Sequence, residues 1–373
     1  MTRALRYLSV CSGIEAATQA WHPLGWRPVA FSEIEPFPCA VLAHRYPEVP
    51  NWGDMTRFKE WPDADVDVLC GGTPCQSFSV AGLRKGLDDP RGNLMLTFGG
   101  IAARYRPDWL AWENVPGVLS SERGRDFASF LGLVSGRAID PPEGGWSSGG
   151  IVPGIADAYG VAWRMLDAQH VRTRRFPFAL PQRRRRVFVV GYLGDWRRAA
   201  AVLFDRESLS GHPAPGRRSG QRPARTLAES PAGSGGQDDT ADRLIAQHSP
   251  PVANPLTARM HKGVNTTMDE GQTMIAYGPP WTVRVLTPVE CERLQGFPDD
   301  FTRIPGASKS GWRDVDKTED VDDLRALGLP VRMVGSRWRV KDPDGPRYKA
   351  IGNSWAVNCA EWIGERIAEV DAW

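Results

Sequence analysis

The stretch LRYLSVCSGIEAATQAWHPLG, residues 5–25, decides the fold. It begins with a short apolar run, Leu5–Val10, and after CSG its apolar residues recur at helical spacing until Gly25. The sequence therefore predicts a strand that turns at CSG directly into a helix. A strand end that opens onto a helix N-terminus is where doubly wound sheets bind nucleotides. Gly13 would let the backbone turn tightly and approach such a ligand, although an ordinary turn is the plain alternative.

The alternation of strand and helix continues along the chain. Further strand-like runs are RPVAFSEIE (27–35), VDVLCGG (66–72), DWLAWENV (108–115) and RVFVVGYLG (186–194). Helical runs between the early strands are PFPCAVLAHRY (36–46) and RGNLMLTFGGIAARYRP (91–107). Such alternation predicts an α/β fold with a doubly wound, mostly parallel sheet that is covered on both faces. The 373 residues favour two domains.

Two acidic residues are predicted to accompany the CSG turn. Glu33 follows Gly13 by 20 residues, at the end of the second predicted strand, where a carboxylate can accept hydrogen bonds from ribose hydroxyls. Asp54, in GDMT, lies near the expected end of a third strand. The full GxGxxG pattern is absent, which argues against a dehydrogenase and fits a nucleoside cofactor without a pyrophosphate.

The six cysteines are scattered, and none belongs to a CxxC pair or a Cys/His cluster with metal-ligand spacing. No signal peptide and no apolar run long enough for a membrane span is visible, so we expect a cytosolic protein with free thiols. Cys75, in GGTPCQSFS, comes directly after a predicted strand. An exposed thiol there can act as a nucleophile. The alternative is a buried cysteine that serves as a small hydrophobic residue.

Charged residues mark two further strand ends. Glu113 ends an apolar run in WENVPG, where burial would raise the pKa of the carboxyl group; a turn or capping acid is the alternative. In PQRRRRVF, alternation places Arg184 and Arg186 on one face and Arg183 and Arg185 on the other. Such an arginine run is also typical of a solvated surface or of one that faces nucleic acid.

The middle of the chain is basic and irregular. Residues 171–225 hold fourteen arginines and three acidic residues, which indicates a polyanionic partner. From about Arg197 to Met274, Gly, Pro, Ser and Arg dominate, as in a linker or in a small domain that orders on its partner. RVLTPVECERLQGFP then predicts a helix with Thr287 as N-cap and Glu290 three residues later. Residues 304–345 look inserted, with an acidic run followed by an expected hairpin in VRMVGSRWRVKD.

Taken together, these segments resemble the DNA (cytosine-5)-methyltransferases. The motifs that carry the resemblance are CSGIEA, SEIE, GDMT, GGTPCQSFS, WENVPG, PQRRRRVF, RVLTPVECERLQGFP and YKAIGNS, between residues 8 and 357. The resemblance implies the Rossmann-like fold of class I S-adenosylmethionine-dependent methyltransferases. It implies a catalytic domain of residues 1–195 plus 346–373, a smaller, irregular target-recognition domain of residues 196–303, and an inserted segment at 304–345.

The resemblance also implies a reaction. Cys75 would add as a thiolate to C6 of a cytosine flipped out of the duplex, and C5 would take the methyl group of S-adenosylmethionine. Glu113 would hold N3 and help to protonate it, and Arg186 would contact O2 with Arg184 in support. Arg284, Glu290, Arg293 and Gln295 would organise the recognition domain.

Further residues are implied by the same match. The cofactor residues would be Cys11, Ser12, Gly13, Ile14, Glu15, Glu33, Ile34, Asp54, Met55, Pro74, Leu94, Asn353 and Ser354. Glu33 would bind the ribose and Asp54 the adenine amino group. The DNA-binding residues would be Gln76, Ser79, Arg183, Arg259 and Lys262. The first motif departs from the family, because Cys11, Glu15 and Ala16 stand where Phe and more glycine are usual, so stacking on adenine would be weaker or would be supplied by Ile34.

Two alternatives remain at this point. A catalytically idle DNA-binding regulator with the same fold is disfavoured by the intact Cys75, Glu113 and Arg186. A transfer-RNA cytosine methyltransferase is disfavoured by the long variable region. We expect a monomer that acts on double-stranded DNA in the bacterial cytoplasm, in restriction-modification or in phage or prophage DNA protection. The recognition sequence and a partner nuclease cannot be read from the chain.

Overall fold

The computed structural model describes residues 3–74, 94–204, 274–277, 282–304, 312–315, 320–326, 329–341 and 344–373. Several residues predicted to act on the base or on DNA lie outside this part of the chain: Cys75, Gln76, Ser79, Arg259 and Lys262. Within the described residues, no helix combines the length and the apolar character that crossing a bilayer requires.

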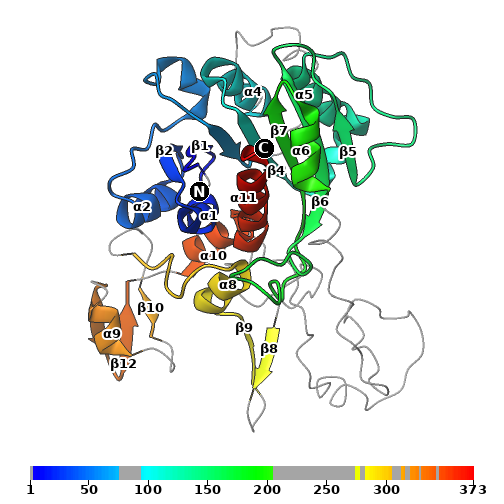
Figure 1. Cartoon of the computed structure of the whole chain (residues 1–373). Coiled ribbons are helices and arrows are strands. Elements are labelled where there is room, and N and C mark those ends of the chain that lie inside the picture. Colours follow the sequence, from blue (N-terminus) through cyan, green and yellow to red (C-terminus); the bar gives the residue numbers. More distant parts are fainter. Residues whose placement is uncertain are drawn as a thin grey trace, which may run out of the picture.

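The centre of the molecule is a seven-stranded sheet in the order β2-β1-β3-β4-β7-β6-β5 (Figure 1). Its strands are β1 (Arg6–Val10), β2 (Arg27–Ser32), β3 (Val68–Gly71), β4 (Trp109–Asn114), β5 (Gly149–Val152), β6 (Tyr159–Asp167) and β7 (Arg185–Leu193). The pairs β1–β2, β1–β3 and β3–β4 are parallel, whereas β7 runs antiparallel to β4 and β6. The prediction of a mostly parallel sheet is confirmed. Because β7 is reversed, it begins where β4 ends.

Helices cover both faces of this sheet. Neighbouring residues of a strand point to opposite faces, so each strand contributes side chains to two cores. Trp109 and Ala111 of β4 join one core, and Leu110 and Trp112 join the other. The first core is closed by α1 (Ala16–Trp21), α2 (Pro36–Arg45), α6 (Trp196–Leu203), α8 (Pro288–Gln295), α10 (Asp344–Asn353) and α11 (Val357–Asp371). The second is closed by α4 (Leu94–Tyr105) and α5 (Arg125–Ser135). Short 3-10 helices are η1 (His22–Leu24), η2 (Met55–Glu60), η5 (Pro116–Leu119) and η6 (Ser121–Gly124).

Helix α6 was not expected from the sequence, which looked irregular from about Arg197 onward. Asp195 caps the helix by accepting a hydrogen bond from the Arg197 amide, and Val202 and Leu203 are fully buried. The helix packs on β6, β7 and α11. Eight residues that border a Gly- and Pro-rich stretch give too short a periodic signal to recognise. We therefore propose that the catalytic domain extends past the expected boundary at 195, to Leu203.

The strand expected before Asp54 is reduced to a single bridge. Only Asn51 pairs with β2, through Phe31, and the pairing is parallel. Pro50 has no amide hydrogen to donate, and Gly53 adopts a positive φ of 74°, so regular pairing cannot continue on either side. Asp54 instead caps η2 by accepting a hydrogen bond from the Thr56 amide.

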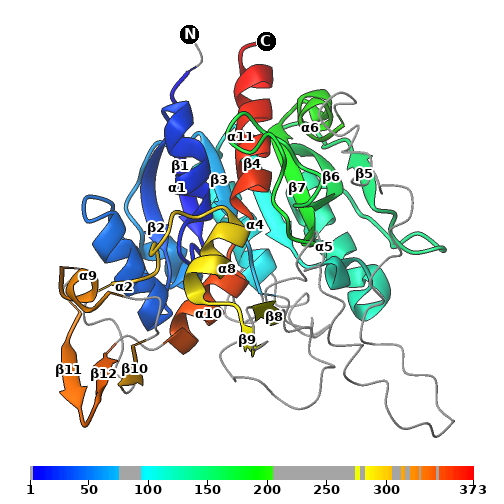
Figure 2. The same ribbon diagram turned by 90° about the horizontal axis from the view of Figure 1, so that it is seen from below.

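The inserted segment forms a separate small unit. Its sheet has the order β10-β12-β11, and α9 (Val321–Ala326) accompanies it. The strands are β10 (Arg313–Asp314), β11 (Val331–Val334) and β12 (Arg337–Val340), which confirms the predicted hairpin. A second hairpin is built from β8 (Met274–Tyr277) and β9 (Thr282–Val285). In Figure 2 both units lie at the end of the molecule opposite the two termini.

Candidate active site

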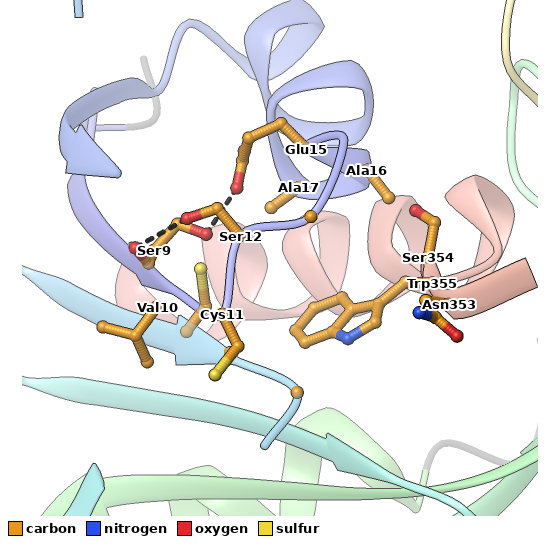
Figure 3. Close-up of a pocket in the computed structure, with 14 residues that line it drawn as sticks. Ser9, Val10, Cys11, Ser12, Glu15, Ala16, Ala17, Asn353, Ser354 and Trp355 are labelled. Carbon is orange, nitrogen blue, oxygen red and sulfur yellow. Dashed lines mark hydrogen bonds between the residues drawn. The ribbon is translucent and has the colours of Figure 1, made fainter. Parts of the chain in front are cut away.

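An open cavity with about 370 Å³ of empty space lies where β1 and β3 end (Figure 3). Six predicted cofactor residues line it: Cys11, Ser12, Gly13, Glu15, Asn353 and Ser354. The cavity therefore joins the first motif of the chain to its last, as expected from the sequence.

Gly13 and Glu33 form one wall of this region. Gly13 has a φ of 56°, and an added Cβ would meet nothing within 4 Å, so the turn faces open space. The Glu33 carboxylate accepts hydrogen bonds from the Gly13 amide at 2.7 Å and from the Ile34 and Glu35 amides at 2.8 Å. Three backbone donors hold this carboxylate at the end of β2.

A second group of predicted cofactor residues lies around Cys11. Its thiol lies 3.4 Å from the Met55 sulfur. Burial, together with a smaller contribution from the nearby Glu33 and Asp54 carboxylates, raises the pKa of this thiol to about 12. Four predicted residues that are distant in the sequence are thus neighbours in the structure.

Glu15 has a different environment from the one expected. Its side chain is buried, and it accepts hydrogen bonds from the Ser9 hydroxyl and from the amide and hydroxyl of Thr18. Burial raises the pKa of the carboxyl group. The carboxylate caps α1 from a residue with φ 66° and shapes the turn. We therefore assign Glu15 to positioning the CSG turn rather than to holding a cofactor by hydrogen bonds.

The remaining cofactor candidates differ in exposure. Ile14 is fully buried in the core and does not line the cavity, so we remove its side chain from the proposed site. Ile34 is 66% exposed beside Glu33 and is free to cover a ligand. Pro74 is exposed, and Leu94 packs partly against the second core.

Glu113 and Arg186 form an ion pair beside the cavity. Glu113 is the second-to-last residue of strand β4, and Arg186 is the second residue of strand β7. The Arg186 Nε lies 3.0 Å from Glu113 Oε1, and the two side chains are 17% and 10% exposed. Burial raises the pKa of Glu113, and the Arg186 and Arg184 guanidinium groups partly oppose that shift. The antiparallel direction of β7 is what lets these strand ends meet.

Gly72 lines the cavity and also lies beside Glu113 of the ion pair. A Cβ at Gly72 would lie 2.8 Å from the Trp355 indole nitrogen and 3.0 Å from Glu113 Oε2. A side chain there would therefore collide with both. The absence of a Cβ at Gly72 lets the cavity and the Glu113–Arg186 pair lie next to each other.

The four arginines alternate as predicted. Arg183 and Arg185 are exposed, whereas Arg184 is buried and Arg186 is largely so. Arg184 donates to the carbonyl oxygens of Gly352 and Ser354, at 3.0 and 2.5 Å. We therefore assign Arg184 to holding the loop at Asn353, rather than to contact with a base.

Three residues of the α8 motif make local structural contacts. Thr287 and Glu290 form a reciprocal capping box. Gln295 is fully buried and donates to the carbonyl oxygens of Ile351 and Ser354, at 2.9 and 3.1 Å. Helix α8 thereby supports the same cavity loop as Arg184.

Trp355 is the main site residue that the sequence reading missed. Its side chain is 8% exposed, packs edge-to-face on Phe188 at 5.7 Å, and forms part of the cavity wall (Figure 3). The signal available was its place directly after GNS. Gly71 and Gly72 were also overlooked as wall residues.

Comparison with known proteins matches residues 5–134 to the family of C-5 cytosine-specific DNA methylases. A relative from Escherichia phage P1, named DNA N-6-adenine-methyltransferase, is 35% identical over 98% of this chain. The chain spans only 61% of the length of that protein. The type II methyltransferase M.DsaV of Dactylococcopsis salina is 25% identical, over 87% of this chain and 85% of the relative.

The fold has solved counterparts. The Dnmt2 methyltransferase of S. pombe superposes with a TM-score of 0.54 at 12% identity, covering 99% of this chain and 100% of that one. At that identity the likeness shows the fold alone. The family model covers residues 5–134 only, so the comparisons show that this part of the chain matches the C-5 cytosine-specific DNA methylases and that the relatives named here are methyltransferases.

Proposed function

We propose that this protein methylates C5 of cytosine within a specific sequence of double-stranded DNA. The observation that carries the proposal is the position of Gly72, next to both Glu113 and Trp355. Glu113, which would recognise a base, therefore lies next to a cavity that would hold a nucleoside cofactor. The methyl donor and its acceptor could then meet without a large movement of the chain.

The residues around the cavity fit S-adenosylmethionine. Glu33 presents a carboxylate that suits ribose hydroxyls, and Asp54 presents one that suits an adenine amino group. Ile34 offers an exposed apolar surface for the adenine ring. Gly13 leaves room for close approach of a ligand to the backbone, because an added Cβ would meet nothing within 4 Å. When bound, S-adenosylmethionine supplies an electrophilic methyl group to C5 of the target base.

Cys75 follows the last described residue of the β3 loop, Pro74, and we propose that it is the nucleophile. Its thiolate would add to C6 of the flipped base, and the electron pair displaced from the C5–C6 bond makes C5 nucleophilic. Glu113, protonated more readily because burial raises the pKa of its carboxyl group, would donate a proton to N3. Arg186 would orient Glu113 and donate to O2. Once C5 has taken the methyl group, loss of the C5 proton to a base or to water expels the thiolate, N3 returns its proton to Glu113, and the ring is restored.

The name of the phage P1 relative supports a second candidate, methylation of adenine N6. That nitrogen is exocyclic and carries its own lone pair, so it needs no covalent addition to the ring. An adenine-specific enzyme would therefore not depend on Cys75. The cytosine family match over residues 5–134, which include Cys75, favours the first candidate.

The test expresses the protein in a bacterial host that lacks DNA methylation. Plasmid DNA is hydrolysed to nucleosides for mass spectrometry and is also mapped by bisulfite sequencing. We expect 5-methylcytosine in one recurrent context, no product from Cys75→Ala, and full product from Cys291→Ala, a buried thiol on α8. N6-methyladenine that persists in Cys75→Ala would favour the second candidate. Soluble protein that leaves neither base modified would favour a DNA-binding regulator.

We also propose the biological setting. The relatives from bacteria and phage are consistent with restriction-modification or with protection of phage or prophage DNA in a bacterial cytoplasm. Such a role requires only double-stranded DNA and S-adenosylmethionine. The exposed Arg183, next to the proposed active site, would contact the DNA backbone.

A further inference from the structure

The small sheet of the inserted segment has two unlike faces. On one face, Val331 and Val340 pack with Leu324 of α9. This face is apolar and partly covered: Val340 and Leu324 are buried, whereas Met333 is 52% exposed. Arg325 of α9 also stacks on Trp338 from this side, with its guanidinium carbon 5.0 Å from the ring centroid.

Arginines gather on the opposite face of the same sheet. Strand alternation and the β11–β12 register place Arg332, Arg337 and Arg339 together on the side away from α9. Arg332 and Arg337 are exposed. Arg332 and Arg339 are direct cross-strand partners, and like charges in that position destabilise a sheet. The local fold therefore bears an electrostatic cost to keep these side chains together.

The arginines are held in place by their neighbours. The Arg332 guanidinium lies 4.1 Å from the centroid of the Trp312 ring. Arg339 donates to the Trp312 carbonyl oxygen at 2.5 Å. Asp314 pairs with Arg337 at 3.1 Å and with Arg339 at 3.2 Å. One carboxylate among three guanidinium groups leaves the described part of this face with a net positive charge.

Acidic residues collect elsewhere in the insert. Asp320 and Asp322 lie at the start of α9, where Asp322 pairs with Arg325 at 2.8 Å. Fold and register thus separate a basic sheet face from an acidic helix side. A surface that contacts only water does not require basic and acidic side chains to lie on opposite sides of the unit.

The insert leads directly into the helix that ends at the cavity loop. Helix α10 runs from the end of the insert at Asp344 to Asn353 in the cavity loop. Ten helical residues span only about 15 Å. Figure 2 shows the insert sheet at the end of the molecule opposite the termini. The parallel strands end toward the same side, since Trp109 at the start of β4 contacts Asp371 near the C-terminus.

We infer that the face formed by Arg332, Arg337 and Arg339, the insert arginine face, binds phosphates of the DNA duplex that flanks the target base. The inference rests on the proposed function, which brings a duplex to this end of the molecule. Guanidinium groups match phosphate oxygens in a bidentate geometry, and arginines already held by stacking lose little freedom on binding. The surface would add affinity and carry no base readout.

Two matched variants test this inference. Arg337→Glu and Arg325→Glu reverse one charge each on the same small unit. Both arginines are exposed and both pair with an aspartate, but they lie on opposite sides of the sheet. Binding to a labelled duplex of about four helical turns, and to one of about one turn, is measured by fluorescence anisotropy across a salt series. Circular dichroism confirms that both variants are folded.

We expect Arg337→Glu to weaken binding to the long duplex about tenfold and to lower the slope of log affinity against log salt by about one. Binding to the short duplex should change much less, and the turnover number at saturating DNA should be unchanged. Arg325→Glu should stay within about twofold of the wild type. Arg332→Ala should also weaken binding to the long duplex, by a smaller factor than Arg337→Glu.

Two results would overturn the inference. Equal losses in Arg337→Glu and Arg325→Glu would show that only net charge matters, and wild-type binding in Arg337→Glu would show that this face does not contact DNA. Failure of the proposed function would look different. The wild type would then modify neither base, while its DNA affinity could still be compared with that of both variants.

Discussion

At the scale of single residues, Glu33 and Glu15 show that the surroundings of a glutamate determine whether its carboxylate can reach a ligand. Glu33 is partly exposed and accepts hydrogen bonds from three backbone amides, so its carboxylate is available at the edge of the site. Glu15 is 1% exposed, and its hydrogen bonds come from Ser9 and Thr18 inside the protein. The Glu33 carboxylate can therefore bind a ligand, whereas the Glu15 carboxylate stabilises the CSG turn.

Replacing Glu15 by Gln tests this difference through the pH dependence of stability. Burial raises the folded-state pKa of Glu15 above 4.5, so the folded state binds the proton more tightly than the unfolded state. The stability from this proton is complete below the unfolded-state pKa and is lost as the pH rises through the folded-state pKa. Glu15→Gln keeps the shape and cannot ionise.

Urea unfolding between about pH 4 and pH 8 measures the effect. We expect the free energy of unfolding of the wild type to fall relative to that of Glu15→Gln as the pH rises. The exposed Glu122→Gln should run parallel to the wild type. Parallel curves for Glu15→Gln as well would show that the Glu15 carboxyl group does not titrate differently in the folded protein.

At the scale of elements, a buried ionic cluster joins α8 to α10. Arg347 and Glu292 are both fully buried, with their charged groups 3.2 Å apart, and Arg347 also donates to the Thr302 hydroxyl at 2.9 Å. Glu292 accepts from the Thr302 amide at 2.9 Å. Since α10 ends at Asn353, this cluster fixes one side of the cavity loop.

Arg347→Ala should destabilise the protein by about 3–5 kcal/mol, because it leaves Glu292 buried without its partner. The double variant Arg347→Met with Glu292→Leu should recover much of that loss, since the two fully buried charges are then both absent and the other partners of Arg347, Asp300 and Asp344, are 32% and 31% exposed. Chemical denaturation of the single and double variants measures the difference. If the double variant is no more stable than Arg347→Ala, packing around Arg347 and not charge accounts for the cost.

At the scale of the whole molecule, the two ends of the chain pack against each other. Helices α1 and α11 are in contact, and the Trp21 indole donates to the Ala360 carbonyl oxygen at 2.8 Å. Figure 1 shows these helices side by side. Gly364 lies against Trp21, where an added Cβ would stand 2.4 Å from an indole carbon. The approach of the helices therefore depends on the missing side chain.

Gly364→Ala should destabilise the protein although alanine favours a helix by about 1 kcal/mol over glycine. Trp21 is fully buried and cannot move aside, so overpacking should cost about 1–3 kcal/mol. Thermal unfolding followed by circular dichroism measures the shift. The exposed Glu369→Ala on the same helix should change stability little. A raised melting temperature in Gly364→Ala would contradict the close contact.

The sequence by itself determined the features that depend on near neighbours. The strand–turn–helix at residues 5–25, the Thr287–Glu290 capping box and the alternation of Arg183 to Arg186 are confirmed. Each follows from periodicity or from hydrogen bonds within a few residues. The order of the motifs also predicted the resemblance to the cytosine-5 methyltransferases, and the family model matches residues 5–134.

Only the tertiary structure decided which of these residues meet. Arg186 reaches Glu113 because β7 runs antiparallel beside β4, and no local pattern encodes that direction. Trp355 enters the cavity wall, and Glu15 turns inward, through packing between segments far apart in the chain. α6 gains its stability from β6, β7 and α11, because an isolated helix of eight residues is marginal in water. Long-range packing thus sets what short-range propensity leaves open.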